Sequence, residues 1–332
     1  MTNRSNGGTT RASVLLAMTA LLALPALGIT SVATASVASA APASGHSTWV
    51  APSRAAVAGA GAHRIAPRTA ASGYDMVGSD GGVFVFGSAG GFFGSLPGLG
   101  VHVDNVVGMV GSVTGRGYFL VGSDGGVFSF GDTTFVGSLP GIGVHVDNIV
   151  GLVPSSTDKG YFLVGTDGGV FAFGDATFAG SLPGTGVHVN DIVGIAGTPD
   201  NKGYWVLGND GTIYNFGTAF AASPLTCPQP GACGNLVSIV STSTGQGFWV
   251  SDQYGDVFNF GDATNVGDFS TSATGPSNIV SLVPSASNLG YFLVGADGGL
   301  FAFGDTTFFG SLPGLGVSVT NIVGAVATRS VA

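Results

Sequence analysis

The chain has 332 residues, of which 59 are glycine, 23 are phenylalanine and only 8% are charged. All 18 acidic residues are aspartate, a turn residue, and none is glutamate, a good helix former, so the composition argues against long amphipathic helices and for an all-β fold. The formal charge of −9 argues against nucleic acid and anionic membrane surfaces as partners, because phosphate groups would be repelled.

The first 40 residues have the pattern of a secretory signal peptide. Two arginines precede the apolar run "ASVLLAMTALLALPALGI", and "ASA" at residues 38–40 offers small residues for cleavage. The alternative is a retained membrane anchor, which Pro25 inside the apolar run disfavours. Residues 41–72 are rich in Ala, Pro, Gly and Ser and predict a flexible linker. We therefore expect an exported protein, with no membrane insertion after signal cleavage, whose folded part is residues 73–332.

The folded part is predicted to repeat one structural unit six times. The units, each about 43 residues long, start with a glycine followed by an aromatic residue, at Gly73, Gly117, Gly160, Gly203, Gly247 and Gly290. Each unit contains four segments with strand composition, and an Asp-Gly or Gly-Asp pair typical of a tight hairpin turn lies between the second and the third. Four antiparallel strands in a unit of this length is the pattern of a β-propeller blade.

The order of the strands predicts how the two ends of the repeat region meet. The region opens at Gly73 with the second to fourth strands of a unit, and it ends with a lone first strand, "NIVGAVATRS", from Asn321. We therefore predict a six-bladed β-propeller of four-stranded antiparallel blades, closed by the C-terminal strand joining the N-terminal blade (1+3 closure). Such closure leaves no unpaired inner edge. An open β-solenoid is the alternative.

These repeats resemble a known family. "GYFLVGSDGGVFSFGDTTFVGSLPG" and its copies are similar to the repeats of secreted bacterial, mostly actinobacterial, β-propeller proteins with the pattern G-Y-W/F-x-V-x-x-D-G-G-V-F-x-F-G-D-A-x-F-x-G-S. The resemblance covers Gly73 to Ala332, with departures at "GTAFAASPLTCPQPGACG" in the fourth unit and "GDFSTSATGPSN" in the fifth. It implies a propeller fold and a cell-envelope setting, and it implies no reaction.

Cys227 and Cys233, in "TCPQPGACG", are predicted to form a disulfide that stiffens one loop of the fourth unit. Export would place them in an oxidising compartment, and the short gap rich in Pro and Gly suits a local bridge. Free or metal-liganding thiols are the alternative, but no histidine is close in sequence. No cofactor or metal is predicted, and calcium is left open without a motif to support it.

Aromatic residues recur at fixed positions and are predicted to form the core. Phe171 and Phe173 lie two apart on one face of a strand, and the other units carry equivalent pairs that would fill the spaces between blades. Trp205 and Trp249 occupy the position that Phe119 holds in the second unit, which assigns them to the core as well. Stacking of sugars on these rings is the alternative.

A polar rim at the mouth of the central channel is the candidate binding site. Its residues come from the loop that enters the first strand of each unit: His102, His145, His188, Asp104, Asp147, Asn105, Asn148, Asp191, Asn235, Asn278 and Asn321. The alternative is that the amides and carboxylates bond to nearby backbone, a structural task repeated with the repeat. Histidines on three different blades would be too far apart for one metal ion.

The sequence favours a non-catalytic protein. The H-E-x-x-H, Gly-Lys-Ser/Thr and G-x-S-x-G motifs do not occur, and the aspartates fall in turns and loops. We therefore predict a secreted, monomeric binding scaffold at the cell envelope or outside the cell, whose ligand is a glycan, a peptide or a cell-wall component. A secreted hydrolase, glycosidase-like or esterase-like, with a pair of aspartates at the channel mouth is the alternative.

Overall fold

The computed structural model describes residues 71–87, 91–225, 235–272 and 274–329, which belong to one compact unit. The predicted signal peptide, all but the last two residues of the predicted linker, and the predicted disulfide between Cys227 and Cys233 lie outside the described residues. The helices of the described part are single 3-10 turns, and none of them has the length and apolar character needed to span a membrane.

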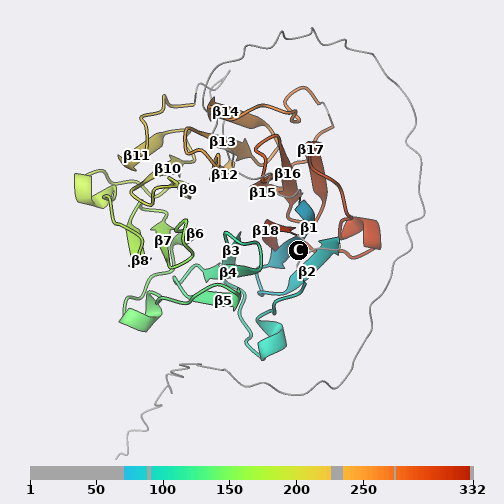
Figure 1. Cartoon of the computed structure of the whole chain (residues 1–332), viewed down its shortest axis with the longest axis horizontal. Helices are drawn as coiled ribbons and strands as arrows, with labels where there is room; N and C mark the ends of the chain where they lie inside the picture. Colours follow the sequence, from blue (N-terminus) through green and yellow to red (C-terminus); the bar gives the residue numbers. More distant parts are fainter. Residues whose placement is uncertain (1–70, 88–90, 226–234, 273, 330–332) are drawn as a thin grey trace, which may run out of the picture. The chain divides into compact units, whose positions relative to one another are not determined.

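The described residues form six antiparallel sheets of three strands each (Figure 1). We number the sheets 1 to 6 in the order β18-β1-β2, β3-β4-β5, β6-β7-β8, β9-β10-β11, β12-β13-β14 and β15-β16-β17. The first strands of sheets 1 to 6 are β18 (Ile322–Arg329), β3 (Val106–Gly111), β6 (Ile149–Pro154), β9 (Ile192–Gly197), β12 (Leu236–Ser241) and β15 (Ile279–Pro284). The second strands are β1 (Ala71–Gly78), β4 (Gly117–Gly122), β7 (Gly160–Gly165), β10 (Gly203–Gly208), β13 (Gly247–Asp252) and β16 (Gly290–Gly295). The third strands are β2 (Val83–Gly87), β5 (Val127–Gly131), β8 (Val170–Gly174), β11 (Ile213–Gly217), β14 (Val257–Gly261) and β17 (Leu300–Gly304).

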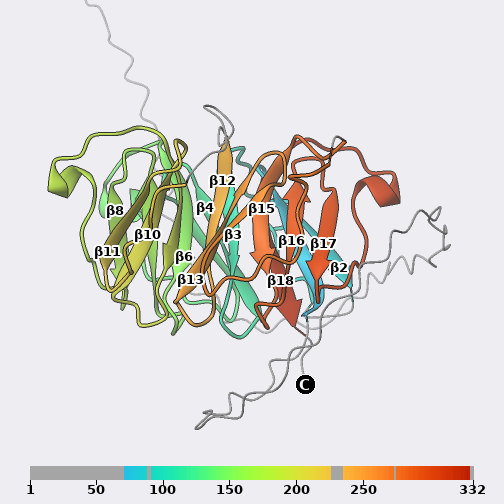
Figure 2. The same cartoon turned by 90° about the horizontal axis from the view of Figure 1, so that it is seen from above.

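The first strands of the six sheets contact one another in a cyclic order. β3 contacts β6, β6 contacts β9, and the series continues through β12 and β15 to β18, which contacts β3. Figure 1 shows these strands around a common centre, and Figure 2 shows from the side that the strands run between the same two faces. In sheet 1, β18 pairs with β1 along its length, with Tyr74 opposite Ala327 and Met76 opposite Ala325. Both ends of the described repeat region therefore lie in one sheet.

The prediction of four strands in each sheet is wrong for the described residues, which form three strands in each sheet. The segment concerned returns instead to the hairpin turn of its own sheet, where the Leu139 N–H donates to the Gly125 carbonyl oxygen at 3.1 Å. Gly125 has φ +74°, and a Cβ there would lie 2.5 Å from the Leu139 side chain, so the glycine of the Asp-Gly turn makes room for the leucine of "GSLPG". The motif ends in a 3-10 turn in four sheets, at η1 (Pro97–Leu99), η2 (Pro140–Ile142), η3 (Pro183–Thr185) and η4 (Pro313–Leu315).

A tyrosine in the second strand ties this segment to the next sheet. The Tyr118 hydroxyl donates to the Gly94 carbonyl oxygen of sheet 1 at 2.5 Å, and Tyr291 donates to Gly267 of sheet 5 at the same distance. Equivalent bonds join Tyr161 to Gly137, Tyr204 to Gly180 and Tyr74 to Gly310. The bond from Tyr74 to Gly310 joins sheet 1 to sheet 6, which places the same connection at the junction of the two chain ends.

Tyr291→Phe is expected to lower the free energy of unfolding by about 1 to 2 kcal/mol, because it removes this hydroxyl and leaves the Gly267 carbonyl without the bond. Urea unfolding followed by tryptophan fluorescence measures the change. Tyr254→Phe is the matched control, since Tyr254 is 48% exposed and its hydroxyl has no partner in the described residues. Equal effects of the two variants would show that the bond between sheets adds no stability.

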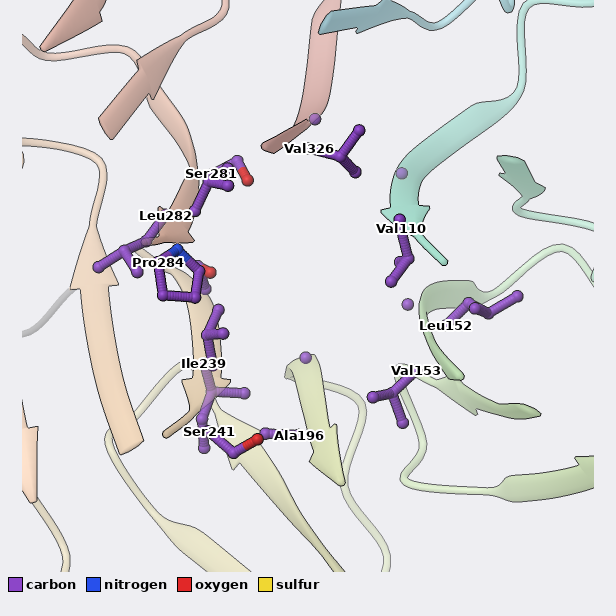
Figure 3. Close-up of a pocket in the computed structure, with 18 of the residues that line it drawn as sticks. Val110, Leu152, Val153, Ala196, Ile239, Ser241, Ser281, Leu282, Pro284 and Val326 are labelled. Atoms are coloured by element: carbon purple, nitrogen blue, oxygen red, sulfur yellow. The ribbon is translucent and has the colours of Figure 1, made fainter. Parts of the chain in front are cut away.

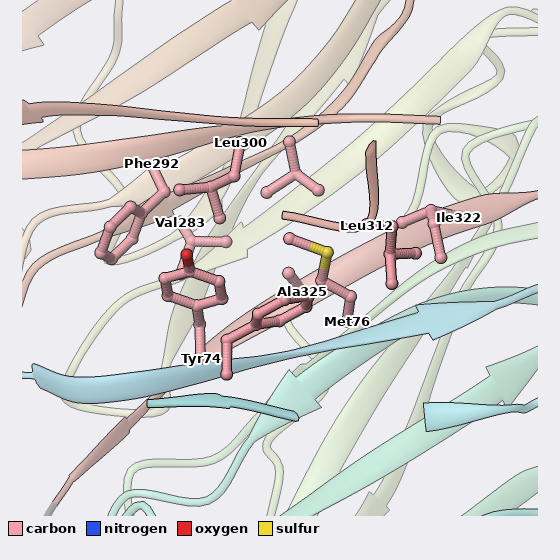
Figure 4. Close-up of a cluster of buried hydrophobic side chains, with 10 residues drawn as sticks. Tyr74, Met76, Val283, Phe292, Leu300, Leu312, Ile322 and Ala325 are labelled. Atoms are coloured by element: carbon pink, nitrogen blue, oxygen red, sulfur yellow. The ribbon is translucent and has the colours of Figure 1, made fainter. Parts of the chain in front are cut away.

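The core lies between neighbouring sheets. Trp205, Trp249, Phe119 and Tyr161 are fully or almost fully buried, which confirms the predicted core role of both tryptophans. The junction of sheets 6 and 1 is packed in the same way as the others, with apolar side chains from β1, β15, β16 and β18 (Figure 4). Tyr74 and Phe292 contact each other there with ring centroids 5.1 Å apart.

Candidate functional site

The predicted rim residues lie at the entrances of the first strands, and their main chain serves the fold. At all six entrances a carbonyl oxygen accepts a hydrogen bond of 2.8 to 3.0 Å from the hairpin turn of the same sheet. The accepting residues are Asn321, Asn105, Asn148, Asp191, Asn235 and Asn278. At five of these entrances, the next residue along donates its N–H to the turn of the preceding sheet, as Ile322 does to Ala296 at 3.0 Å. These bonds connect sheet to sheet.

The side chains of Asn105, Asn148, Asn278 and Asn321 each pack over the glycine that ends the second strand of their sheet. A Cβ at Gly122 would lie 2.5 Å from the Asp124 carboxylate and 3.1 Å from the Asn105 amide nitrogen, so both side chains cover this glycine. The Asp124 carboxylate in turn accepts the Gly126 N–H at 2.9 Å. The entrance loops and the Asp-Gly turns therefore lie on the same face.

The histidines and the two neighbouring aspartates of the rim have a different setting. His102, His145, His188, Asp104 and Asp147 are exposed, and none of them lines either of the two cavities described below. Within the described ranges, no three His, Cys, Asp or Glu side chains are grouped closely enough to hold a metal ion. The structure brings these five residues to the surface but does not bring them together.

Two cavities lie along the centre of the six first strands. One of them, the central cavity, has a volume of about 510 Å³ and extends from the second residues of these strands to the hairpins that follow them (Figure 3). The other, of about 630 Å³, opens at the entrance loops and is lined by Asn190, Asp191 and Asn209. Asp191 is thus the predicted rim residue that reaches a cavity. Burial raises the pKa of Tyr214, and the negative charges of Asp210 and Asp191 raise it further.

A ring of six valines lines both cavities where they adjoin. It consists of the second residue of each first strand or its equivalent: Val107, Val150, Val193, Val237, Val280 and Val323. The central cavity is lined by aliphatic, glycine, hydroxyl and amide groups, and no described lining residue is ionisable. The apolar and hydroxyl residues of this lining can be read from first-strand sequences such as "NIVGLVP" and "NLVSIVS". The sequence does not tell which of these side chains face the centre, because a bulge near the start of each first strand sets their direction.

Asp75 is an unusual residue that the sequence analysis missed. It stands in β1 where the other second strands carry Phe or Trp, and it is completely buried between sheets 1 and 2. Neither carboxylate oxygen has a partner in the described residues. Burial raises the pKa of Asp75 to about 7. The pKa of Tyr118 is raised first by the burial of Tyr118 itself and then by the charge of Asp75. The contrast between "GYDMVG" and "GYFLVG" was the available signal.

The chain was compared with known proteins. No protein-family model matches it, and no curated protein matches it. Among solved structures, the β-propeller domain of Cps50 (Swd1) from Myceliophteria thermophila has 13% sequence identity to the chain and a TM-score of 0.40. The match covers 60% of this chain and 65% of that structure, so the chain spans less than two thirds of its length.

Proposed function

We propose that the protein is a six-bladed β-propeller, closed by β18 in sheet 1, that acts as a non-catalytic secreted binding scaffold of the bacterial propeller-repeat kind. The pairing of β18 with β1 and the cyclic contacts of the first strands support the closure. The hydrogen bond from Tyr74 to Gly310 supports it too, because it repeats at the chain ends the bond found between other neighbouring sheets. The export pattern of the N-terminal sequence supports a location outside the cell.

A series of exposed phenylalanines carries the binding proposal. Phe92, Phe135, Phe178 and Phe308 are 54% to 57% exposed and occupy the same position beyond the third strand of sheets 1, 2, 3 and 6. These sheets are consecutive in the cyclic order, whereas sheets 4 and 5 have Ala221 and Asn265 at this position. Exposed apolar side chains that form one patch mark interaction surfaces, and we propose that these four rings form such a patch. Rings of this kind suit the apolar faces of sugars in a glycan or wall polymer, and apolar side chains of a peptide are the other candidate ligand.

Co-sedimentation of the full-length protein with insoluble cell-wall polysaccharide tests the proposal. We expect retention of the wild type and at least about tenfold weaker retention when the four phenylalanines are replaced by serine. The matched control is Leu289→Ser, which changes a side chain that is 57% exposed but outside the series. Absence of retention, or equal retention of all variants, would refute the wall-binding surface. Release of soluble sugar during the assay would favour the hydrolase instead.

A further inference from the structure

The central cavity has one side that differs from the rest. At the third residue of the first strand, β3, β6, β9 and β18 have glycine, whereas β12 and β15 have Ser238 and Ser281. At the sixth residue, β12 has Ser241, and its counterparts are Gly, Pro or Ala. All three serines line the cavity, and Figure 3 shows Ser241 and Ser281 on its wall. Because β12 and β15 are neighbours, the hydroxyls are gathered in one sector.

The hydroxyls of these serines have no partner within the described residues. Several serines and threonines of the adjoining hairpins are different, since their hydroxyls have partners. Ser285 pairs with Ser287 at 2.8 Å, and Thr242 donates to Asp262 at the same distance. A partnerless hydroxyl that faces an otherwise aliphatic cavity is available to a ligand. Binding is favourable when the ligand supplies a polar group that forms a hydrogen bond with this hydroxyl.

The rest of the wall restricts what such a ligand can be. The described lining residues offer no charged side chain to balance a charged ligand, and burying an unpaired charge in an aliphatic cavity is costly. The six isopropyl groups of the valine ring line the end of the cavity near the entrance loops. A volume of about 510 Å³ falls within the range of small-molecule pockets, about 300 to 1,000 Å³.

From these observations we infer that the central cavity binds a small, uncharged, mainly apolar molecule that carries a hydroxyl or carbonyl group oriented by Ser238, Ser241 and Ser281. The ligand enters from the side of the hairpins that follow the first strands and stops at the valine ring. This site is separate from the exposed phenylalanines, so it goes beyond the proposed function and does not depend on it.

The experiment uses two fluorescent probes of nearly equal shape, 2-naphthol and naphthalene, which are both uncharged at pH 7. Each is titrated into the full-length protein, and the dissociation constant is measured from the change in probe fluorescence. We expect saturable binding of both. The double variant Ser238→Ala with Ser281→Ala is expected to weaken 2-naphthol by about five- to tenfold, the effect of one or two lost hydrogen bonds, and to change naphthalene less than twofold.

Two further variants keep the test decisive. Val153→Phe places a ring in the cavity from β6 and is expected to abolish binding of both probes while circular dichroism and wall retention stay unchanged. Ser129→Ala removes a partnerless hydroxyl of β5 outside the cavity and should alter neither affinity.

Absence of saturable binding, or binding that survives Val153→Phe, would overturn the inference. Equal weakening of both probes by the serine variants would overturn the role of the hydroxyls. Wall retention is measured separately, so failure of the cavity and failure of the wall-binding surface are distinguishable.

Discussion

Asp75→Asn is expected to stabilise the protein at pH 8 by up to about 4 kcal/mol and to leave its stability at pH 4 nearly unchanged. Asp75 is completely buried between sheets 1 and 2, and its carboxylate has no partner in the described residues. Burial raises its pKa from 3.8 to about 7. Ionisation therefore costs free energy in the folded chain that it does not cost in the unfolded chain.

The direction of the pH dependence follows from proton binding. Between about pH 4 and 7 the folded chain keeps a proton on Asp75 that the unfolded chain releases, so the free energy of unfolding falls as the pH rises. The stability that Asp75 contributes is fully present below the pKa of this residue in the unfolded chain, and it is lost above about pH 7. A span of about three pH units, at about 1.4 kcal/mol each, gives the upper limit of about 4 kcal/mol. Asparagine does not ionise, so this part of the slope disappears.

Urea unfolding at pH 4, 6 and 8 measures the effect. Asp80→Asn is the matched control, because Asp80 is exposed in the first hairpin turn, and the slope should persist in that variant. Asp75→Phe copies Phe292, which packs with Tyr74 at the junction of sheets 6 and 1, and it is expected to stabilise the protein at pH 4 as well. Identical pH dependence of wild type and Asp75→Asn would contradict a buried, unpaired carboxylate.

Deletion of residues 320–332 is expected to lower the free energy of unfolding by at least about 5 kcal/mol, enough to abolish a cooperative transition in a protein of ordinary stability. The deletion removes β18, with the buried Ile322, Ala325 and Val326, and it uncovers Met76 and Val77 in β1. Each large aliphatic side chain that loses its burial costs about 1.5 to 3 kcal/mol. Several such losses add up to the expected change.

The two buried tryptophans make this deletion informative about the whole set of sheets. Trp205 and Trp249 lie in sheets 4 and 5, away from the deleted strand. If the six sheets depend on one another, the deletion will shift tryptophan emission to longer wavelength, and a synthetic peptide of residues 320–332 added in trans will restore it. Unchanged emission and an unchanged urea midpoint would mean that the sheets fold independently of β18.

Most of the fold was visible in the repeats, because each strand carries its own local pattern. The second strands β4 and β7 start at the predicted Gly117 and Gly160, and the hairpin turns lie at the predicted Asp-Gly pairs. The fourth strand was wrong for a physical reason. "TFVGSLPG" has the composition of a strand, but the Tyr161 hydroxyl of the next sheet takes the Gly137 carbonyl, and Leu139 packs on Gly125. These contacts are tertiary and leave no local signature.

The candidate site was less predictable. The sequence placed residues such as Asn105 at the entrances of the first strands. It did not show whether their main chain or their side chains make the important hydrogen bonds. Comparison of the units reveals Ser238 and Ser281 in place of glycine, and Asp75 in place of an aromatic residue. That the serines face a cavity, and that Asp75 is buried without a partner, depends on the neighbouring sheets.

Amide hydrogen exchange of the segment 322–329, followed by mass spectrometry, tests the proposed closure most directly. If β18 completes sheet 1, its amides will exchange as slowly as those of the equivalent first strands β6 and β15, because all three are hydrogen-bonded on the same pattern. Exchange of this segment within seconds, while β6 and β15 stay protected for hours, would contradict the closed arrangement.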